Sequence, residues 1–294
     1  FELMVPVLVG LSVTQLNLFV NQNLASRLTP GIVAALRTGQ RLMQLPIGVF
    51  AVAVAVAVFP TLTEYAAKGE MNQFKKTMSL GVRSIIFLTL PAAVGLIALR
   101  VPIIRLLFEQ GKFTREATLA TSYALLFYSI GLFGYSAQQV LNRTFYAIQD
   151  TLTPVKVGVI TILLNIALNF ILIEFLSYGG LALSYSLAGI FNMAALLYYL
   201  RKKIGSINGR ALMTSFFQTL TSSVIMGIMA YYTAWYLEKV LDMSYKINQL
   251  IQVSVSITVG VIVFAILALY FRAEEMYLVW NILSRRFRGN NRMS

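Results

Sequence analysis

The sequence of 294 residues contains no cysteine and no histidine. Without cysteine the chain forms no disulfide bond and no thiolate metal site, and without histidine it lacks the usual general base and zinc ligand. Charged residues are also scarce, because they make up 12% of the chain where a soluble domain has about 25%. These absences exclude most hydrolytic and metal-dependent mechanisms and argue against a water-soluble or disordered chain.

Long apolar runs take the place of the missing polar residues, since 58% of the chain is hydrophobic. A helix needs about 20 apolar residues to cross a bilayer. About eight segments meet this length and are predicted as membrane-spanning helices: 3–24, 32–59, 78–99, 118–146, 155–175, 180–200, 211–235 and 250–271. The fold class is therefore predicted to be an all-α polytopic membrane protein.

The net charge of +13 indicates which side of the membrane the loops face. In so apolar a chain, the excess of Lys and Arg indicates contact with anionic lipid and the positive-inside rule, with no nucleic acid as partner. Four segments, 61–83, 143–156, 201–210 and 272–294, hold 15 of the 24 Lys and Arg residues. We therefore predict that these segments and the C-terminus are cytoplasmic, with residues 273–294 as a basic tail along the inner leaflet.

Two shorter segments have the pattern of amphipathic helices lying on the membrane surface. The sequence RVPIIRLLFEQGKF, residues 100–113, carries cations on the side that the positive-inside rule leaves outside. Residues 64–76 are the second candidate, on the cytoplasmic side. Both are predicted as surface elements outside the spans.

The second predicted span carries polar side chains that are costly in a membrane. Arg37, Arg41 and Gln44 are spaced by four and three residues, so they share one helical face. Arg41 lies about 13 Å along the helix from Ile32. Either its side chain reaches back to the interface, or it faces an aqueous cavity that binds an anionic substrate. Arginine suits a phosphate ligand because its planar fork donates two parallel hydrogen bonds.

Amide side chains form a second polar group inside the spans. Asn21 lies in the first span, and Asn165 and Asn169 lie one turn apart in the fifth. Such amides commonly hydrogen-bond to a neighbouring helix, or they provide oxygen ligands for a small cation. The acidic residues fall almost wholly in predicted loops, so acid–base catalysis has no obvious location and no enzyme is predicted.

Three stretches of sequence go beyond composition. They are QLNLFVNQNLAS (15–26), QRLMQLPIGVFAVAVAVAVFPTLTEYA (40–66) and NRTFYAIQDTLTPVKV (142–157). In this order and spacing they resemble the MurJ (MviN) family of lipid II flippases, within the superfamily of multidrug and polysaccharide exporters. The resemblance implies that this chain corresponds to helices seven to fourteen of such a protein. Residues 1–200 would then be a six-helix lobe, and 201–272 two further helices that hold a polyprenyl tail. The N-terminal lobe would be a missing partner.

The resemblance also implies a function in the bacterial cytoplasmic (inner) membrane. Lipid II, an undecaprenyl-diphosphate-linked peptidoglycan precursor, would be flipped by alternating access. Arg41 matches a family arginine that binds the diphosphate, whereas Gln44 stands where the family often has an acidic residue. A sodium ion, the one cofactor implied, would bind Asn21, Asn165, Asn169 and Tyr185, although amides replace family carboxylates at Asn21 and Asn169. The alternatives are a flippase for another polyprenyl-diphosphate-linked oligosaccharide, a drug exporter and an inactive membrane scaffold.

Overall fold

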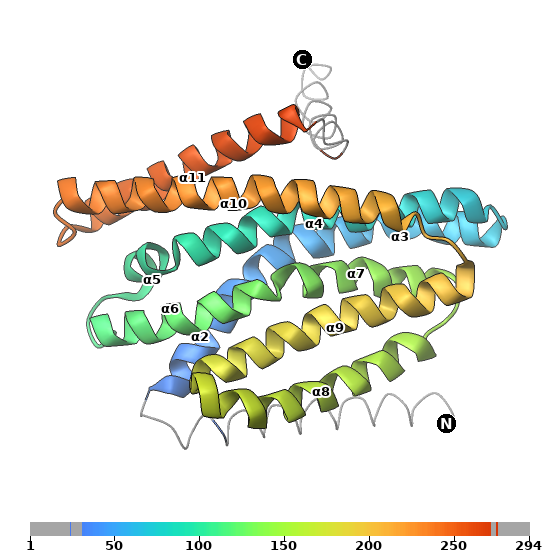
Figure 1. Cartoon of the computed structure of the whole chain (residues 1–294), viewed down its shortest axis with the longest axis horizontal. Helices are drawn as coiled ribbons and strands as arrows, with labels where there is room; N and C mark the ends of the chain where they lie inside the picture. The colour runs from blue at the N-terminus through green and yellow to red at the C-terminus, as the bar shows by residue number, and fades with distance from the viewer. Residues whose placement is uncertain (1–23, 25–30, 272–274, 276–294) are drawn as a thin grey trace, which may run out of the picture.

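The computed structural model describes Leu24, residues 31–271 and Glu275, and every element within these residues is a helix. The helices lie side by side with their long axes roughly aligned (Figure 1). In chain order they are α2 (Ile32–Pro46), η1 (Ile47–Ala51), α3 (Val52–Ala67), α4 (Met71–Ala98), α5 (Arg100–Phe108), α6 (Arg115–Ile130), α7 (Leu132–Ala147), α8 (Leu152–Leu176), α9 (Tyr178–Ile204), α10 (Gly209–Val240) and α11 (Lys246–Tyr270).

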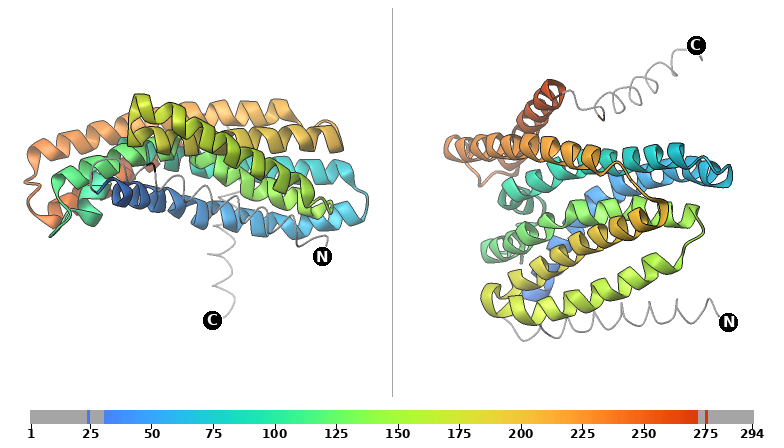
Figure 2. Two further views of the ribbon diagram at one scale, coloured as in Figure 1. Left: turned by 90° about the horizontal axis from the view of Figure 1, so that it is seen from below. Right: turned by 45° about the vertical axis from the view of Figure 1, so that its right-hand side comes forward.

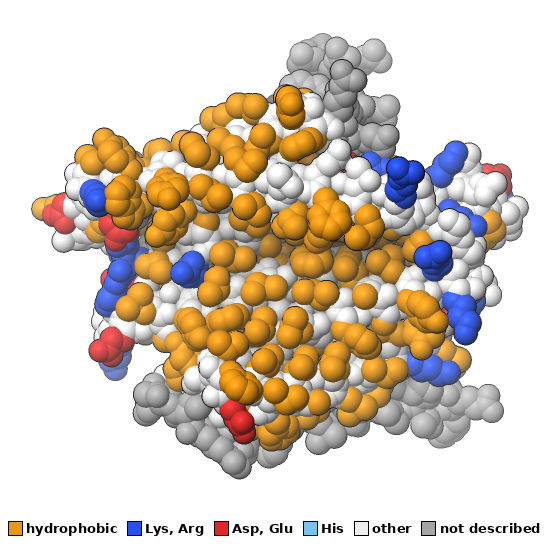
Figure 3. All heavy atoms as spheres, in the orientation of Figure 1, with side chains coloured by type: hydrophobic (Ala, Val, Ile, Leu, Met, Phe, Trp, Pro, Cys, Tyr) orange, Lys and Arg blue, Asp and Glu red, His pale blue; other side chains and the backbone are white. Residues whose placement is uncertain are grey.

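Within the described residues, six helices are long and apolar enough to cross a membrane, and the bent pair α6 and α7 makes a seventh. Hydrophobic side chains cover most of the face in Figure 3, while Lys and Arg lie mainly toward its ends. Two further views show the same aligned bundle (Figure 2). The predicted all-α polytopic class is confirmed. The first predicted span, 3–24, lies outside the described residues apart from Leu24.

The second predicted span is longer than expected and is a single helix from Ile32 to Ala67. A turn of π-helix, η1, follows Pro46, whose nitrogen cannot donate a backbone hydrogen bond. The prediction of a separate surface helix at 64–76 is wrong. The spanning helix continues through Glu64 to Ala67, Gly69 adopts a left-handed conformation with φ +71°, and α4 begins at Met71. The glycine turns the chain, and both flanking segments belong to spanning helices.

The predicted fourth span is two helices, α6 and α7, bent by 44° at Gly131. A Cβ atom at Gly131 would lie 2.4 Å from the Cα of Ser186, so the missing side chain lets α9 pack against the bend. The Ser186 hydroxyl lies 2.6 Å from the carbonyl oxygen of Phe127 and 3.0 Å from that of Tyr128. It thus provides a donor for carbonyl groups in the last turn of α6, where the Tyr128 carbonyl group also accepts from the backbone N–H of Gly131 at 3.2 Å.

Residues 100–108 form a helix as predicted, but this helix is not a free surface element. The Arg105 side chain is buried and donates hydrogen bonds to Glu238 Oε1 at 2.7 Å and to Gln252 Oε1 at 2.8 Å. Lys246 Nζ donates to the carbonyl groups of Arg105 and Glu109 at 3.1 and 3.0 Å, at the C-terminal end of α5. These contacts dock α5 against α10 and α11. Its location at the membrane interface stays a prediction.

One residue of the predicted basic tail is described, and it is buried. Glu275 accepts hydrogen bonds from Arg83 Nε at 2.6 Å and from Ser215 Oγ at 2.9 Å. A buried carboxylate between two donors is more favourable than an isolated one, so Glu275 holds this part of the chain against α4 and α10. The basic tail along the inner leaflet stays a prediction. The other residues of 273–294 lie outside the described part of the chain.

Asp150, within the motif at 142–157, stabilises the start of α8 through its side chain. Asp150 Oδ1 accepts a hydrogen bond from the backbone N–H of Thr153 at 3.0 Å, and Oδ2 accepts from the Thr153 hydroxyl at 2.6 Å. Lys203 Nζ, at the end of α9, lies 2.7 Å from the same Oδ2 atom. Burial by itself raises the pKa of Asp150, but these hydrogen bonds outweigh it and lower the pKa from 3.8 to about 2.

We expect Asp150→Asn to retain the helix cap but lose the ion pair, and Asp150→Ala to lose both, at a further cost of about 1 kcal/mol. Because the folded pKa is depressed, the carboxylate stabilises the native state above pH 3.8, and this contribution is lost as the pH falls toward 2. Thermal unfolding in detergent between pH 2 and 5 measures the effect. An Asp150→Asn protein whose midpoint depends on pH as strongly as the parent would contradict this assignment.

Candidate functional site

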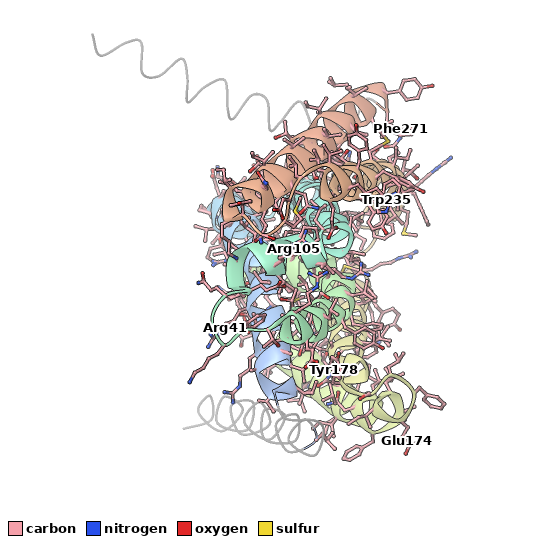
Figure 4. The ribbon with its side chains drawn as sticks, turned by 90° about the vertical axis from the view of Figure 1, so that its left-hand side faces the viewer. Arg41, Arg105, Glu174, Tyr178, Trp235 and Phe271 are labelled. Carbon is pink, nitrogen blue, oxygen red and sulfur yellow. The ribbon has the colours of Figure 1, made fainter. Side chains whose placement is uncertain are left out.

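The predicted polar face of α2 is present on the outside of the bundle. Arg37, Arg41 and Gln44 are all exposed, whereas Leu36, Leu42 and Met43 on the opposite face are buried. Figure 4 shows Arg41 on α2 at the edge of the bundle, while Arg105 lies between α5 and the pair α10 and α11. The shared face predicted from the spacing is therefore observed. Its role in binding stays a prediction.

The two arginines border an open groove of about 460 Å³. Its lining also includes Gly31, Ala34 and Thr38, so the walls are small and partly polar. Within the described residues, no carboxylate lies within ion-pair distance of Arg37 or Arg41. A groove with two guanidinium groups on a membrane span that have no acidic partner in the described part of the chain can bind an anion without first breaking a salt bridge to those residues.

Close packing holds the arginine face in place. A Cβ atom at Gly39 would lie 3.2 Å from the backbone nitrogen of Leu125, so α2 approaches α6 closely at this point. Gln40, next to Arg41 in the chain, hydrogen-bonds to the side chain of Tyr185 on α9. Because its two neighbouring helices fix α2 on this side, the Arg41 face has a defined direction.

Tyr185 belongs to an aromatic cluster that sequence reasoning did not find. Its ring stacks on Tyr135 with centroids 4.4 Å apart and meets Tyr128 edge-on at 5.6 Å. The Tyr135 hydroxyl donates to the Tyr185 carbonyl oxygen at 3.1 Å. The three tyrosines come from α9, α7 and α6, and no local spacing in the sequence relates them. The cluster ties the helix that carries Tyr185 to the bent pair.

The amides of α8 are buried as predicted for polar groups inside a span. Asn165 is 2% exposed and Asn169 is fully buried. The Asn165 side chain has no hydrogen-bond partner among the described residues. A neighbouring polar contact joins Asn192 Nδ2 on α9 to Thr161 Oγ1 on α8 at 2.9 Å. Asn21 lies outside the described residues, so the four-residue cation site, including Tyr185, stays a prediction.

The chain matches the family model described as "Lipid II flippase MurJ" over residues 1–256. This match covers most of the chain. The chain belongs to the MurJ family. Among curated relatives, the chain is 39% identical over 194 residues to the "Probable lipid II flippase MurJ" of Vibrio cholerae serotype O1, covering 66% of this chain and 37% of that protein. It is 34% identical over 237 residues to the protein of the same name from Haemophilus influenzae, covering 79% and 46%.

Solved structures agree with this assignment. The structure described as "Lipid II flippase MurJ, inward closed conformation" aligns with a TM-score of 0.74 and 30% identity, over 92% of this chain and 54% of that chain. A structure described as that of a MOP superfamily transporter from Pyrococcus furiosus aligns with a TM-score of 0.59 at 16% identity, which shows the fold alone. The chain therefore spans less than half of the length of these two curated MurJ relatives and about half of the solved one.

Proposed function

We propose that this chain forms one wall of a flippase that carries a polyprenyl-diphosphate-linked precursor, lipid II, across the bacterial inner membrane. The observation that carries the proposal is the exposed α2 face, where Arg37 and Arg41 border a groove without a carboxylate partner among the described residues. The relatives' names support lipid II as the substrate. No bond is broken in this process, so the proposed activity is transport and not catalysis.

In this proposal the arginines hold the diphosphate, while the prenyl chain stays in the lipid. Guanidinium groups bind phosphate through parallel charge-assisted hydrogen bonds, and the surrounding low-dielectric medium strengthens them. Gln44, one turn beyond Arg41, adds a neutral donor and acceptor. A cationic face also discriminates against cationic drugs, so it favours the flippase over the drug exporter. The prenyl-tail groove predicted on α10 and α11 and the sodium site remain proposals.

The other wall belongs, in this proposal, to the N-terminal lobe found in the longer relatives. Alternating access needs two bodies that rock around a central site. The direct test is a chimera in which this chain replaces the region that it matches in the Haemophilus influenzae relative. Growth of cells depleted of their own flippase, together with lipid II translocation, would support the proposal. A stable, membrane-inserted chimera that supports neither would favour the inactive scaffold.

The orientation of the chain is a further part of the proposal. The loop that contains Ser206 and the loop that contains Ser244 lie at opposite ends of the 32-residue helix α10, and both serines are exposed. Because the chain has no cysteine, single cysteines at these positions give clean labelling. The positive-inside rule predicts that Ser206→Cys resists an impermeant thiol reagent in intact cells, whereas Ser244→Cys reacts. The reverse pattern would invert the orientation and place the C-terminus outside.

A further inference from the structure

A second groove lies between α4 and α10 and shares no lining residue with the groove of Arg41. It has a volume of about 440 Å³. Its apolar walls come from Val94, Ile97 and Ala98 on α4 and from Val224, Gly227 and Ile228 on α10. Ile228 is half exposed and faces the lipid side of the bundle. In a bilayer, an apolar groove open to the outside of the bundle is filled by hydrocarbon chains.

The floor of this groove is sealed by close packing of the two helices. A Cβ atom at Gly227 would lie 2.4 Å from Val94 Cγ1, so α4 and α10 touch at this point. Just beyond, Leu99, Ala230 and Ala234 form a buried cluster. The groove is therefore a surface channel along a closed seam, and a chain lying in it would not enter the interior of the bundle.

One end of the groove carries an arginine. Arg100 lines the groove together with Tyr231 and Tyr232. Its Nη1 atom donates a hydrogen bond to the carbonyl oxygen of Ile97 at 2.7 Å, which holds the guanidinium group beside the groove wall. A single hydrogen bond to a carbonyl group leaves most of the five guanidinium N–H donors available.

Arg100 and Lys112 have no acidic partner among the described residues, unlike the neighbouring Arg105 and Arg115. Arg105 is paired with Glu238 at 2.7 Å, and Arg115 lies 3.6 Å from Glu109. Lys112 lies in an exposed loop, where water can solvate it. Of Arg100, Arg105, Lys112 and Arg115, Arg100 lines the apolar groove. It has no acidic partner in the described part of the chain.

The position of Arg100 along α4 and α5 fits the boundary between hydrocarbon and headgroups. Residues 84–99 carry no charge, and Arg83 and Arg100 are 17 positions apart. At a rise of 1.5 Å per residue this is about 25 Å, close to the hydrocarbon thickness of about 30 Å. The exposed Tyr231 and Tyr232 are typical of the same boundary.

We propose that the α4–α10 groove binds one membrane glycerophospholipid with an anionic headgroup. One acyl chain lies between the apolar walls, and the phosphate accepts hydrogen bonds from the Arg100 guanidinium group. The choice of occupant rests on charge complementarity, because an unpaired arginine at the headgroup boundary favours a lipid with net negative charge over a zwitterionic one. The site shares no lining residue with the α2 groove proposed to bind the diphosphate, and its α10 wall belongs to the helix that is proposed, with α11, to hold the prenyl tail.

The experiment uses the purified 294-residue chain in nanodiscs that contain equal amounts of phosphatidylglycerol and phosphatidylcholine. Native mass spectrometry after release counts the lipids that stay bound. The parent chain should retain a phosphatidylglycerol molecule in preference to phosphatidylcholine. Arg100→Gln can keep the hydrogen bond to Ile97 but removes the charge, and it should reduce this preference by about tenfold. Ala98→Phe fills the groove and should reduce retention of both lipids.

A matched variant makes the result specific. Lys112→Ala removes an exposed cation that does not line the groove, so it should retain phosphatidylglycerol as the parent does. Unchanged preference in folded Arg100→Gln protein would overturn the proposal. A second result would also overturn the proposal: undecaprenyl diphosphate displaces the retained phosphatidylglycerol, and Arg41→Ala abolishes the retention of phosphatidylglycerol. The α4–α10 groove would then belong to the path of the transported precursor.

Discussion

Arg41→Ala is expected to abolish lipid II translocation by the chimera with the Haemophilus influenzae relative, and Arg41→Lys to impair it. Alanine removes the charge from the groove, whereas lysine keeps the charge but loses the bidentate fork. Losing charge-assisted hydrogen bonds costs about 1.5–3 kcal/mol, or roughly 10- to 100-fold in affinity for the diphosphate. Binding of lipid II to purified protein and its translocation in vesicles measure the two consequences separately.

Arg37→Ala is the matched comparison, because it removes the same side chain one turn closer to the start of α2. Solvent near the groove entrance screens its charge, so we expect a smaller loss. The comparison is made at equal protein abundance, since either change could alter folding. If Arg41→Ala retains full binding and flipping while Arg37→Ala does not, the principal anion-binding residue has been assigned wrongly.

Gly131→Ala, at the bend between α6 and α7, is expected to lower the stability of the protein. The new methyl group would lie 2.4 Å from the Cα atom of Ser186, and a backbone atom cannot move aside as a flexible side chain can. Helix α9 must shift, which also weakens the contact of the Ser186 hydroxyl with the Phe127 carbonyl group. Overpacking of this kind costs about 1–3 kcal/mol, measurable as a lower midpoint of thermal unfolding in detergent.

Gly158→Ala provides the control for this substitution. Gly158 lies within α8, and no atom of the described residues comes within 4 Å of the position that a Cβ atom would take. Alanine there should be neutral or slightly stabilising, because glycine lowers helix stability. Equal midpoints for Gly131→Ala and Gly158→Ala would show that the contact between the bend and α9 contributes little to stability.

Much of the fold could be predicted because a membrane helix is recognised from the residues within its own segment. Apolar length gave the seven spans that lie within the described residues, and the four-and-three spacing placed Arg37, Arg41 and Gln44 on one face. Both inferences need only residues within a few turns of each other. The same locality explains why the exposed Arg41 face could be predicted before its surroundings were known.

Contacts between residues far apart in the chain could not be predicted from the sequence. The partners of Arg105, Glu238 and Gln252, are more than 130 positions away from it. Arg83, the partner of Glu275, lies 192 positions earlier in the chain. The tyrosine cluster around Tyr185 has no local signature at all. Buried polar pairs between distant helices are therefore what composition and periodicity could not find.

In the proposed mechanism the α2 groove contacts the transported precursor. A photoreactive amino acid at Thr38, between the two arginines, tests it most directly in the chimera supplied with radiolabelled lipid II. A matched probe at Val261, which is exposed on α11, controls for general contact with lipid. We predict cross-linking at Thr38 that excess undecaprenyl diphosphate prevents and that Arg41→Ala reduces. Equal, uncompeted cross-linking at both positions in a chimera that flips lipid II would contradict the claim.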